Sequence, residues 1–266
     1  MNQPIGIFDS GMGGLTVLRA LRRQLPNESF VYLGDTARLP YGTKSGETVS
    51  RYAVQAAAAL VTRGIKLLVI ACNTASAYAL PAVQDFAVVP VIGVIDPGAR
   101  AAVAAAAQGP IAVIATEGTV KGGAYARAIR TIAPAIEVVQ QPCPLFVPLA
   151  EEGLTKGDIA EAVARHYLAP LCESRPRCLV LGCTHFPVLK GIIAQTIGTG
   201  IALVDSAETT ALMVETTLRE RNLLNGGAAG GTTYLVTDAA DRFVRVGQTF
   251  LGESIDTGSV EIVDLQ

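Results

Sequence analysis

The sequence of 266 residues lacks the features that mark nucleic-acid-binding and membrane proteins. Lysine and arginine together number 21 against 23 aspartates and glutamates, and no basic run or aromatic-basic interleaving occurs. The apolar stretches are strand-sized, and the longer Ala-rich run at residues 99–107 is far too short to span a bilayer. We therefore expect no nucleic-acid partner and no membrane association.

Signals for secretion, disulfides and metal are also missing. An apolar strand is expected from Pro4 to Asp9, which leaves no room for a signal peptide before it. The five cysteines include no Cys-x-x-Cys pair, which favours reduced thiols over a disulfide framework. Cys172, Cys178, Cys183 and His185 have spacings that match no common zinc module. These observations predict a cytoplasmic protein without a metal site.

Strand-like and helix-like segments alternate along the whole chain. Half of the residues are apolar and only 17% are charged, which is typical of a compact protein. Strands are expected at residues 4–9, 30–34, 67–71, 90–95, 111–115, 136–139, 178–182, 201–205 and 232–237, with helices between them. Strict alternation predicts an α/β fold with mainly parallel sheets and helices on both faces, that is, three layers.

The second series of strands repeats the first at a nearly constant offset. Ile111 lies 106 positions after Ile5, Cys183 lies 111 after Cys72, and Asp205 lies 109 after Asp96. Such self-similarity indicates an internal duplication.

The duplication predicts two pseudo-symmetric domains with an active site in the cleft between them. Residues 1–96 plus 208–266 would form the first domain and carry Cys72, and residues 97–207 would form the second and carry Cys183. The chain would therefore cross between the domains twice, which predicts a hinge. A long helix should follow Asp205, with Ser206 as its N-cap.

Two similar stretches, Leu67–Thr74 and Cys178–His185, each end a buried strand with a cysteine. In open parallel sheets, ligands bind beyond the carboxyl ends of the strands. A lone cysteine at such a place is usually part of the core, as we expect for Cys143, Cys172 and Cys178. The matched pair, each followed by polar residues, instead predicts two thiols facing one small ligand from opposite sides, a geometry suited to moving a proton from one face of a carbon to the other.

Other polar residues at strand ends are candidates for the same site. Asp9 and His185 are the natural charged partners of the two thiols, although each could equally be structural. Ser10, Asn73, Thr74 and Thr184, with backbone N–H groups at helix starts, could hold a carboxylate. Either Glu151 or Glu152 could meet an ammonium group.

With these residues in hand, the chain resembles the bacterial glutamate racemases of the cofactor-independent aspartate/glutamate racemase superfamily. The resemblance covers nearly the whole chain and rests on Gly6–Thr16, Tyr32–Asp35, Leu39–Gly42, Ala71–Ala77 and Gly182–Pro187. It implies that L- and D-glutamate interconvert by a two-base mechanism without a cofactor, with D-glutamate feeding peptidoglycan synthesis. It also implies a homodimer, without selecting an arrangement.

The resemblance carries residue roles as well. Cys72 would act on D-glutamate with help from Asp9, and Cys183 on L-glutamate with help from His185 and Glu151. Positions that would hold the substrate are Ser10, Pro40, Tyr41, Gly42, Asn73, Thr74 and Thr184. Some relatives carry an N-terminal extension tied to activation by a cell-wall precursor, and the short segment before the first strand predicts that this activation is absent here.

The lysines independently favour chemistry without pyridoxal phosphate. None of Lys44, Lys66, Lys121, Lys156 and Lys190 ends a predicted strand beside a phosphate-binding loop, as a Schiff-base lysine would. Two other functions fit the same pattern: a racemase of another small acid, such as aspartate or a hydantoin, and a two-lobed binding protein for a small carboxylate.

Overall fold

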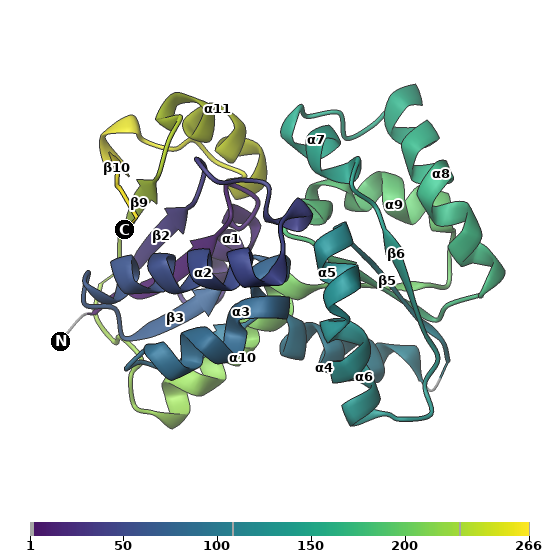
Figure 1. The fold of residues 1–266 in the computed structure, drawn as a ribbon, viewed down its shortest axis with the longest axis horizontal. Helices are drawn as coiled ribbons and strands as arrows, with labels where there is room; N and C mark the ends of the chain where they lie inside the picture. Colours follow the sequence, from purple (N-terminus) through teal and green to yellow (C-terminus); the bar gives the residue numbers. More distant parts are fainter. Residues whose placement is uncertain (1–2, 108, 229, 266) are drawn as a thin grey trace.

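The computed structural model describes residues 3–107, 109–228 and 230–265, and contains two parallel β-sheets flanked by helices (Figure 1). The six-stranded first sheet has the order β10-β9-β2-β1-β3-β4, and the four-stranded second sheet has the order β6-β5-β7-β8. The strands are β1 Ile5–Asp9, β2 Phe30–Gly34, β3 Leu67–Ile70, β4 Val91–Gly93, β5 Ile111–Ala115, β6 Val138–Pro142, β7 Cys178–Gly182, β8 Ala202–Asp205, β9 Thr232–Val236 and β10 Val260–Ile262. The predicted α/β fold with parallel sheets is confirmed.

Helices connect successive strands and cover the sheets. They are α1 Leu15–Gln24, α2 Gly46–Val61, α3 Asn73–Phe86, α4 Ile95–Ala106, α5 Glu117–Gly122, α6 Ala124–Ile132, α7 Phe146–Glu151, α8 Asp158–Glu173, α9 Lys190–Ile197, α10 Ser206–Glu220 and α11 Ala240–Leu251. The strands β1, β2, β3, β5 and β7 are buried at every position, as expected for parallel strands covered on both faces. Within the described ranges, no helix is both long and apolar enough to cross a membrane.

The two sheets share one strand order. In the first sheet β1 lies between β2 and β3, and β4 pairs with the far side of β3. In the second sheet β5 lies between β6 and β7, and β8 pairs with the far side of β7. Cys72 therefore follows β3 and Cys183 follows β7, which are equivalent strands of the two sheets.

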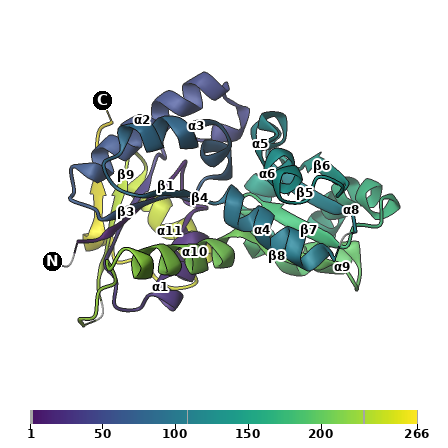
Figure 2. The ribbon, with the colours of Figure 1, turned by 90° about the horizontal axis from the view of Figure 1, so that it is seen from below.

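The chain leaves the first sheet after β4 and returns to it with β9 and β10, which extend that sheet beside β2. Helix α10 leads back and packs against both α1 and α4, so it bridges the two halves (Figure 2). This path agrees with a C-terminal segment that crosses back. The domain limits at residues 96–97 and 207–208 stay a prediction, and residues 1–2 and 266 lie outside the described ranges.

The fourth expected strand is shorter than predicted. Strand β4 ends at Gly93, and Asp96 lies in the first turn of α4 rather than at a strand end. The Ser76 hydroxyl donates to the Ile70 carbonyl and accepts from the Val94 N–H at 3.3 Å, which diverts the backbone of Val94 from the sheet. The offset between Asp96 and Asp205 therefore does not relate equivalent positions.

Three other local predictions are corrected. Strand β6 begins at Val138 instead of Ile136. Helix α10 is capped by Asp205, whose Oδ1 accepts from the Ala207 N–H at 2.8 Å, so Ser206 is its first residue. Cys172 is exposed on α8, whereas Cys143 and Cys178 are buried as expected.

Candidate active site

Cys72 lies at the N-terminus of α3 and takes the place of a capping residue. Its Sγ accepts from the Ala75 N–H at 3.4 Å and donates to the Ser10 Oγ at 3.5 Å. Only 5% of the residue is exposed. Burial, and next the charge of Asp9, raise the pKa of Cys72 to about 12. Cys72 is therefore a thiol at neutral pH.

Asp9 ends β1 and is completely buried. Its Oδ2 accepts from the Gly11 N–H at 3.0 Å, and its Oδ1 accepts from the Thr184 hydroxyl at 3.5 Å. Burial raises the pKa of Asp9, and the charge of His185 opposes that shift without cancelling it. This carboxyl thus links the Cys72 side to the loop that follows Cys183.

Cys183 directly follows β7 and begins a chain of polar contacts. Its Sγ lies 3.8 Å from Nδ1 of His185, and Nε2 of His185 lies 3.0 Å from Oε1 of Glu151. Burial lowers the pKa of His185, but the contacts with Cys183 and Glu151 outweigh burial and raise it to about 10. This side of the site therefore presents an imidazolium to its thiol, whereas the Cys72 side presents the carboxyl of Asp9.

The structure resolves which glutamate meets His185. The Glu151 side chain is 12% exposed and contacts both His185 and Arg242, whereas the Glu152 side chain is 68% exposed and lies 4.0 Å from Arg242. Burial raises the pKa of Glu151, but the contacts with His185 and Arg242 prevail and leave it below its usual value. Glu151 is therefore an anion at neutral pH.

Two glycines in the loop after β1 leave room for residues that accompany the two thiols. A Cβ at Gly13 would lie 2.4 Å from Nδ1 of His185 and 2.5 Å from the Thr184 hydroxyl. A Cβ at the next residue, Gly14, would lie 2.5 Å from Cβ of Asp9. The loop after β1 therefore fits against both sets of partners only because it carries no side chains there.

A cluster of three threonine hydroxyls joins the halves at another point. The Thr74 hydroxyl of α3 lies 3.0 Å from the hydroxyls of both Thr116, the N-cap of α5, and Thr119 within α5. A Cβ at Gly42 would lie 2.7 Å from Cβ of Thr116, so the loop before α2 also approaches α5 closely. Residues Thr74 and Gly42, predicted to hold the substrate, are thus brought to the boundary between the two sheets.

Asn73 has an unused donor. Its Oδ1 accepts from the Tyr125 hydroxyl at 2.7 Å, but its buried Nδ2 has no hydrogen-bond partner among the described residues. A buried unpaired donor costs free energy, about 1–3 kcal/mol, unless a ligand or water meets it. Asn73 can therefore donate to an acceptor that enters beside Cys72.

Tyr41 contributes differently from Asn73. Its hydroxyl donates to Oδ2 of Asp35, and its ring packs between Phe8 and Tyr52. The side chain is therefore engaged in the core of the first sheet. Its neighbours Pro40 and Gly42 line a small pocket of about 160 Å³ together with residues that include Thr116 and Val147.

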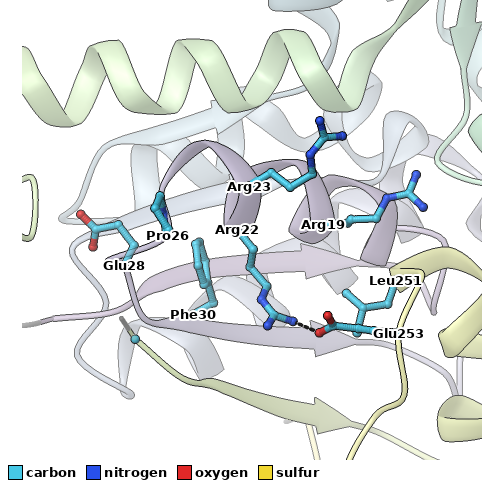
Figure 3. A pocket seen from close by; sticks show the side chains of 9 residues that line it. Arg19, Arg22, Arg23, Pro26, Glu28, Phe30, Leu251 and Glu253 are labelled. Carbon is cyan, nitrogen blue, oxygen red and sulfur yellow. Dashed lines mark hydrogen bonds and ion pairs between the residues drawn. The ribbon is translucent and has the colours of Figure 1, made fainter. Parts of the chain in front are cut away.

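A pocket of about 310 Å³ lies elsewhere, along α1, and none of the predicted site residues lines it (Figure 3). Three arginines of α1 surround it, and one of them, Arg22, pairs with Glu253. Within the ranges the structure describes, no group of three or more His, Cys, Asp and Glu side chains is arranged to hold a metal ion.

The fold and the site together define a class of protein. Two α/β halves present one nearly buried thiol each, and an acidic partner on one side faces an imidazole–carboxylate pair on the other. Buried thiols with such partners are suited to acid–base chemistry on a small substrate enclosed between the halves.

Comparison with known proteins identifies the family. The model of the Asp/Glu/Hydantoin racemase family matches residues 5–214, and the chain belongs to this family. A glutamate racemase of Geobacter metallireducens is 54% identical over 263 residues, covering 98% of this chain and 97% of the relative. The resemblance noted from the motifs and the predicted enzyme class, an amino-acid racemase, are confirmed.

Solved structures agree over the same length. The glutamate racemase of Francisella tularensis in complex with D-glutamate has a TM-score of 0.93 at 41% identity and covers 99% of this chain and 98% of its own. The glutamate racemase of Thermus thermophilus in complex with β-chloro-D-alanine has a TM-score of 0.89 at 46% identity, with the same coverage.

Several residues of the site escaped the sequence analysis. Gly13 lies in the stretch Gly6–Thr16, which supports the resemblance but was given no role at Gly13 itself, and Tyr125, Arg242 and Phe250 lie on helices with no strand-end signal. The ring of Phe250 meets the ring of His185 edge to face at a centroid distance of 5.0 Å. No local sequence pattern predicts these contacts, because they depend on how α6 and α11 pack against the rest of the protein.

Proposed function

We propose that this protein interconverts L- and D-glutamate without a cofactor, with Cys72 and Cys183 as the two acid–base groups. The observation that carries the proposal is the placement of two nearly buried thiols after equivalent strands, β3 and β7, with partners of opposite charge. Its substrate is taken from the glutamate racemases to which the chain is similar along its length.

Racemisation from L-glutamate begins at Cys183. Its thiolate takes the α-proton, so the C–H bond breaks, an S–H bond forms and the electron pair stays on the α-carbon. The Cys72 thiol then gives its proton to the opposite face, which forms D-glutamate and leaves Cys72 as a thiolate. Conversion of D-glutamate runs through the same steps in reverse, with Cys72 as the base.

The resting charges suit this assignment. Cys72 is a thiol at neutral pH and can serve as the acid, because burial and Asp9 disfavour its thiolate. His185 is an imidazolium and lies 3.8 Å from Cys183, so it presents a positive charge to the sulfur that acts as the base in this direction. Glu151 holds the imidazole from its other nitrogen at 3.0 Å.

The carbanion has no electron sink, so its stabilisation must come from positioned dipoles. The unpaired Nδ2 of Asn73 is one donor for the substrate carboxylate. Backbone N–H groups at the start of α3, together with Ser10, Thr74 and Thr184, complete the proposed set of substrate-holding residues. Because both thiols are nearly buried, the two halves must separate to admit glutamate.

Optical activity provides the decisive test. Purified protein, with no pyridoxal phosphate added, should bring the circular dichroism of either L- or D-glutamate to zero. In ²H₂O the α-position should acquire deuterium at the same time. A signal that stays flat for both enantiomers, without deuterium exchange, would refute the function. Aspartate and a hydantoin, assayed in parallel, should stay unchanged.

The same proposal includes a role for the product and a state for the protein. D-glutamate would supply peptidoglycan synthesis in the cytoplasm, and the protein would act as a homodimer. Expression of the chain should restore growth, without added D-glutamate, to a bacterium that requires it. Sedimentation equilibrium should give twice the mass of the 27.6 kDa chain.

A further inference from the structure

Helix α11 belongs to the first sheet but touches the catalytic partners that follow the second. Its inner face packs on α1, where a Cβ at Gly247 would lie 2.8 Å from Cδ1 of Leu15, and its Phe243 ring lies 5.9 Å from that of Tyr32. The helix is thus fixed to the first sheet. Figure 1 shows α11 beside the first sheet and α7, which ends in Glu151, beside the second.

Two side chains of α11 extend across this boundary. Nη2 of Arg242 donates to Oε2 of Glu151 at 3.0 Å, while the other oxygen of Glu151 contacts His185. The Phe250 ring meets the imidazole of His185 edge to face. Both the carboxylate and the imidazole that serve Cys183 are therefore held by a helix from the Cys72 side.

We propose that Arg242 is a positioning residue of the reaction, which keeps Glu151 aligned with His185 and so completes the Cys183 side only when the two halves are closed. The inference rests on the proposed function and deepens it. Arg242 touches neither thiol, and it would act through Glu151 and His185.

The charges around Glu151 set the direction of the expected effect. Glu151 faces His185, which lies in the loop after β7, and Arg242, which lies on α11. The next residue, Glu152, is exposed and lies 4.0 Å from Arg242. His185 in turn faces Cys183 and Asp9. Loss of the guanidinium removes one of the cations that hold the pKa of Glu151 down, so this carboxylate becomes protonated at a higher pH.

The decisive variant is Arg242→Met, which keeps the length of the side chain but not its charge. We expect kcat/KM to fall about tenfold, as for loss of a charged hydrogen bond, and the acidic limb of its pH profile to move upward. Arg242→Lys should restore part of the lost kcat/KM and return the acidic limb part of the way to its wild-type position. The matched control is Arg245→Met, which removes an exposed arginine of the same helix that forms no ion pair among the described residues.

A second measurement localises the effect. In a Cys72→Ala background, Arg242→Met should slow deuterium exchange into L-glutamate, which needs Cys183, by about tenfold. In a Cys183→Ala background, it should leave exchange into D-glutamate within about twofold. A structural role for Arg242 would lower both exchange rates together, without moving the acidic limb.

The outcomes separate this inference from the function beneath it. If wild-type protein racemises glutamate and Arg242→Met behaves like Arg245→Met in activity and pH profile, the positioning role is wrong and the function stands. Equal slowing of both exchange reactions would also overturn the positioning role. If wild-type protein neither racemises nor exchanges glutamate, both proposals fall.

Discussion

Cys72 and Cys183 occupy equivalent places in two sheets of the same strand order, yet the groups around them differ in sign. Asp9 and burial keep Cys72 as a thiol, whereas His185, with its pKa raised to about 10, presents a cation to Cys183. In the proposed mechanism, two copies of one strand arrangement thus supply the acid and the base of one reaction. The comparison teaches that topology brings the thiols together and that the residues just beyond the strands assign their roles.

Removal of either thiol is the most severe test of the acid and base roles proposed for Cys72 and Cys183. Cys72→Ala and Cys183→Ala should each lower racemisation by at least about 1,000-fold, because each direction needs both groups. Deuterium exchange should survive on one side only, into L-glutamate for Cys72→Ala and into D-glutamate for Cys183→Ala. Nuclear magnetic resonance of the α-proton distinguishes the two. Near wild-type turnover in either variant would contradict the two-base assignment.

The paired glycines allow each side to be disturbed separately. Gly13→Ala would push its Cβ into His185 and Thr184, and Gly14→Ala would push its Cβ into Asp9. Overpacking of this kind costs about 1–3 kcal/mol, so we expect both variants to unfold at lower urea concentration. Gly13→Ala should slow deuterium exchange into L-glutamate more than exchange into D-glutamate. Gly14→Ala should have the opposite preference.

A control for these variants is Gly191→Ala on α9, where a Cβ would meet no atom within 4 Å. It should be neutral or stabilise the protein by up to about 1 kcal/mol, because alanine is the better helix former. If Gly13→Ala matched this control in stability and in both exchange rates, the close approach of the two halves would be irrelevant to the site.

The imidazole should leave a signature in stability against pH. Because the pKa of His185 is raised from 6.5 to about 10 on folding, its contribution is complete below pH 6.5 and is lost as the pH rises towards 10. Relative to His185→Gln, the wild-type free energy of unfolding should fall by about 1–3 kcal/mol between pH 7 and pH 10. Urea titrations of both proteins at several pH values measure this difference. If the free energies of unfolding of wild type and His185→Gln changed equally between pH 7 and pH 10, the predicted contribution of His185 would be ruled out.

The smallest effect concerns the acidic partner of Cys72. Since the charge of Asp9 contributes to the raised pKa of this thiol, Asp9→Asn should lower that pKa and speed alkylation of Cys72 at pH 8 by up to about tenfold. Peptide mapping by mass spectrometry follows each thiol, with Cys183 in the same sample as reference. An unchanged or slower rate of alkylation at Cys72 would show that Asp9 does not raise the pKa of this thiol.

The sequence was sufficient to predict the parts of the site that strands deliver. Asp9, Cys72 and Cys183 follow buried apolar runs, and the carboxyl ends of parallel strands share one edge of a sheet, so the alternation of elements was enough to group them. The repeat predicted two pseudo-symmetric halves, and the strand order that the two sheets share agrees with that prediction. His185 was expected beside Cys183 because it lies only two residues further along the chain, and its Nδ1 lies 3.8 Å from that sulfur, whereas its role stays a prediction.

Contacts made sideways by helices could not be predicted in this way. Arg242 is 91 residues from Glu151 along the chain, and its pairing depends on the angle at which α11 packs on α1. The sequence assigned no role to Gly13, and the structure shows that the absence of a side chain there leaves room for Thr184 and His185. Tyr41 was predicted to hold the substrate, and its hydroxyl is already engaged by Asp35, so any contact it makes with a ligand stays a prediction.

Thermodynamics limits what the opposite charges beside the two thiols can achieve. L- and D-glutamate are mirror images with equal free energies in water, so the equilibrium constant between them is one for any catalyst. The unlike surroundings of Cys72 and Cys183 can make the saturated rates of the two directions differ, but they cannot enrich either enantiomer. Conversion of L-glutamate beyond an equal mixture of the two enantiomers therefore requires a separate reaction that consumes D-glutamate, and the asymmetric site determines only how quickly the mixture is restored.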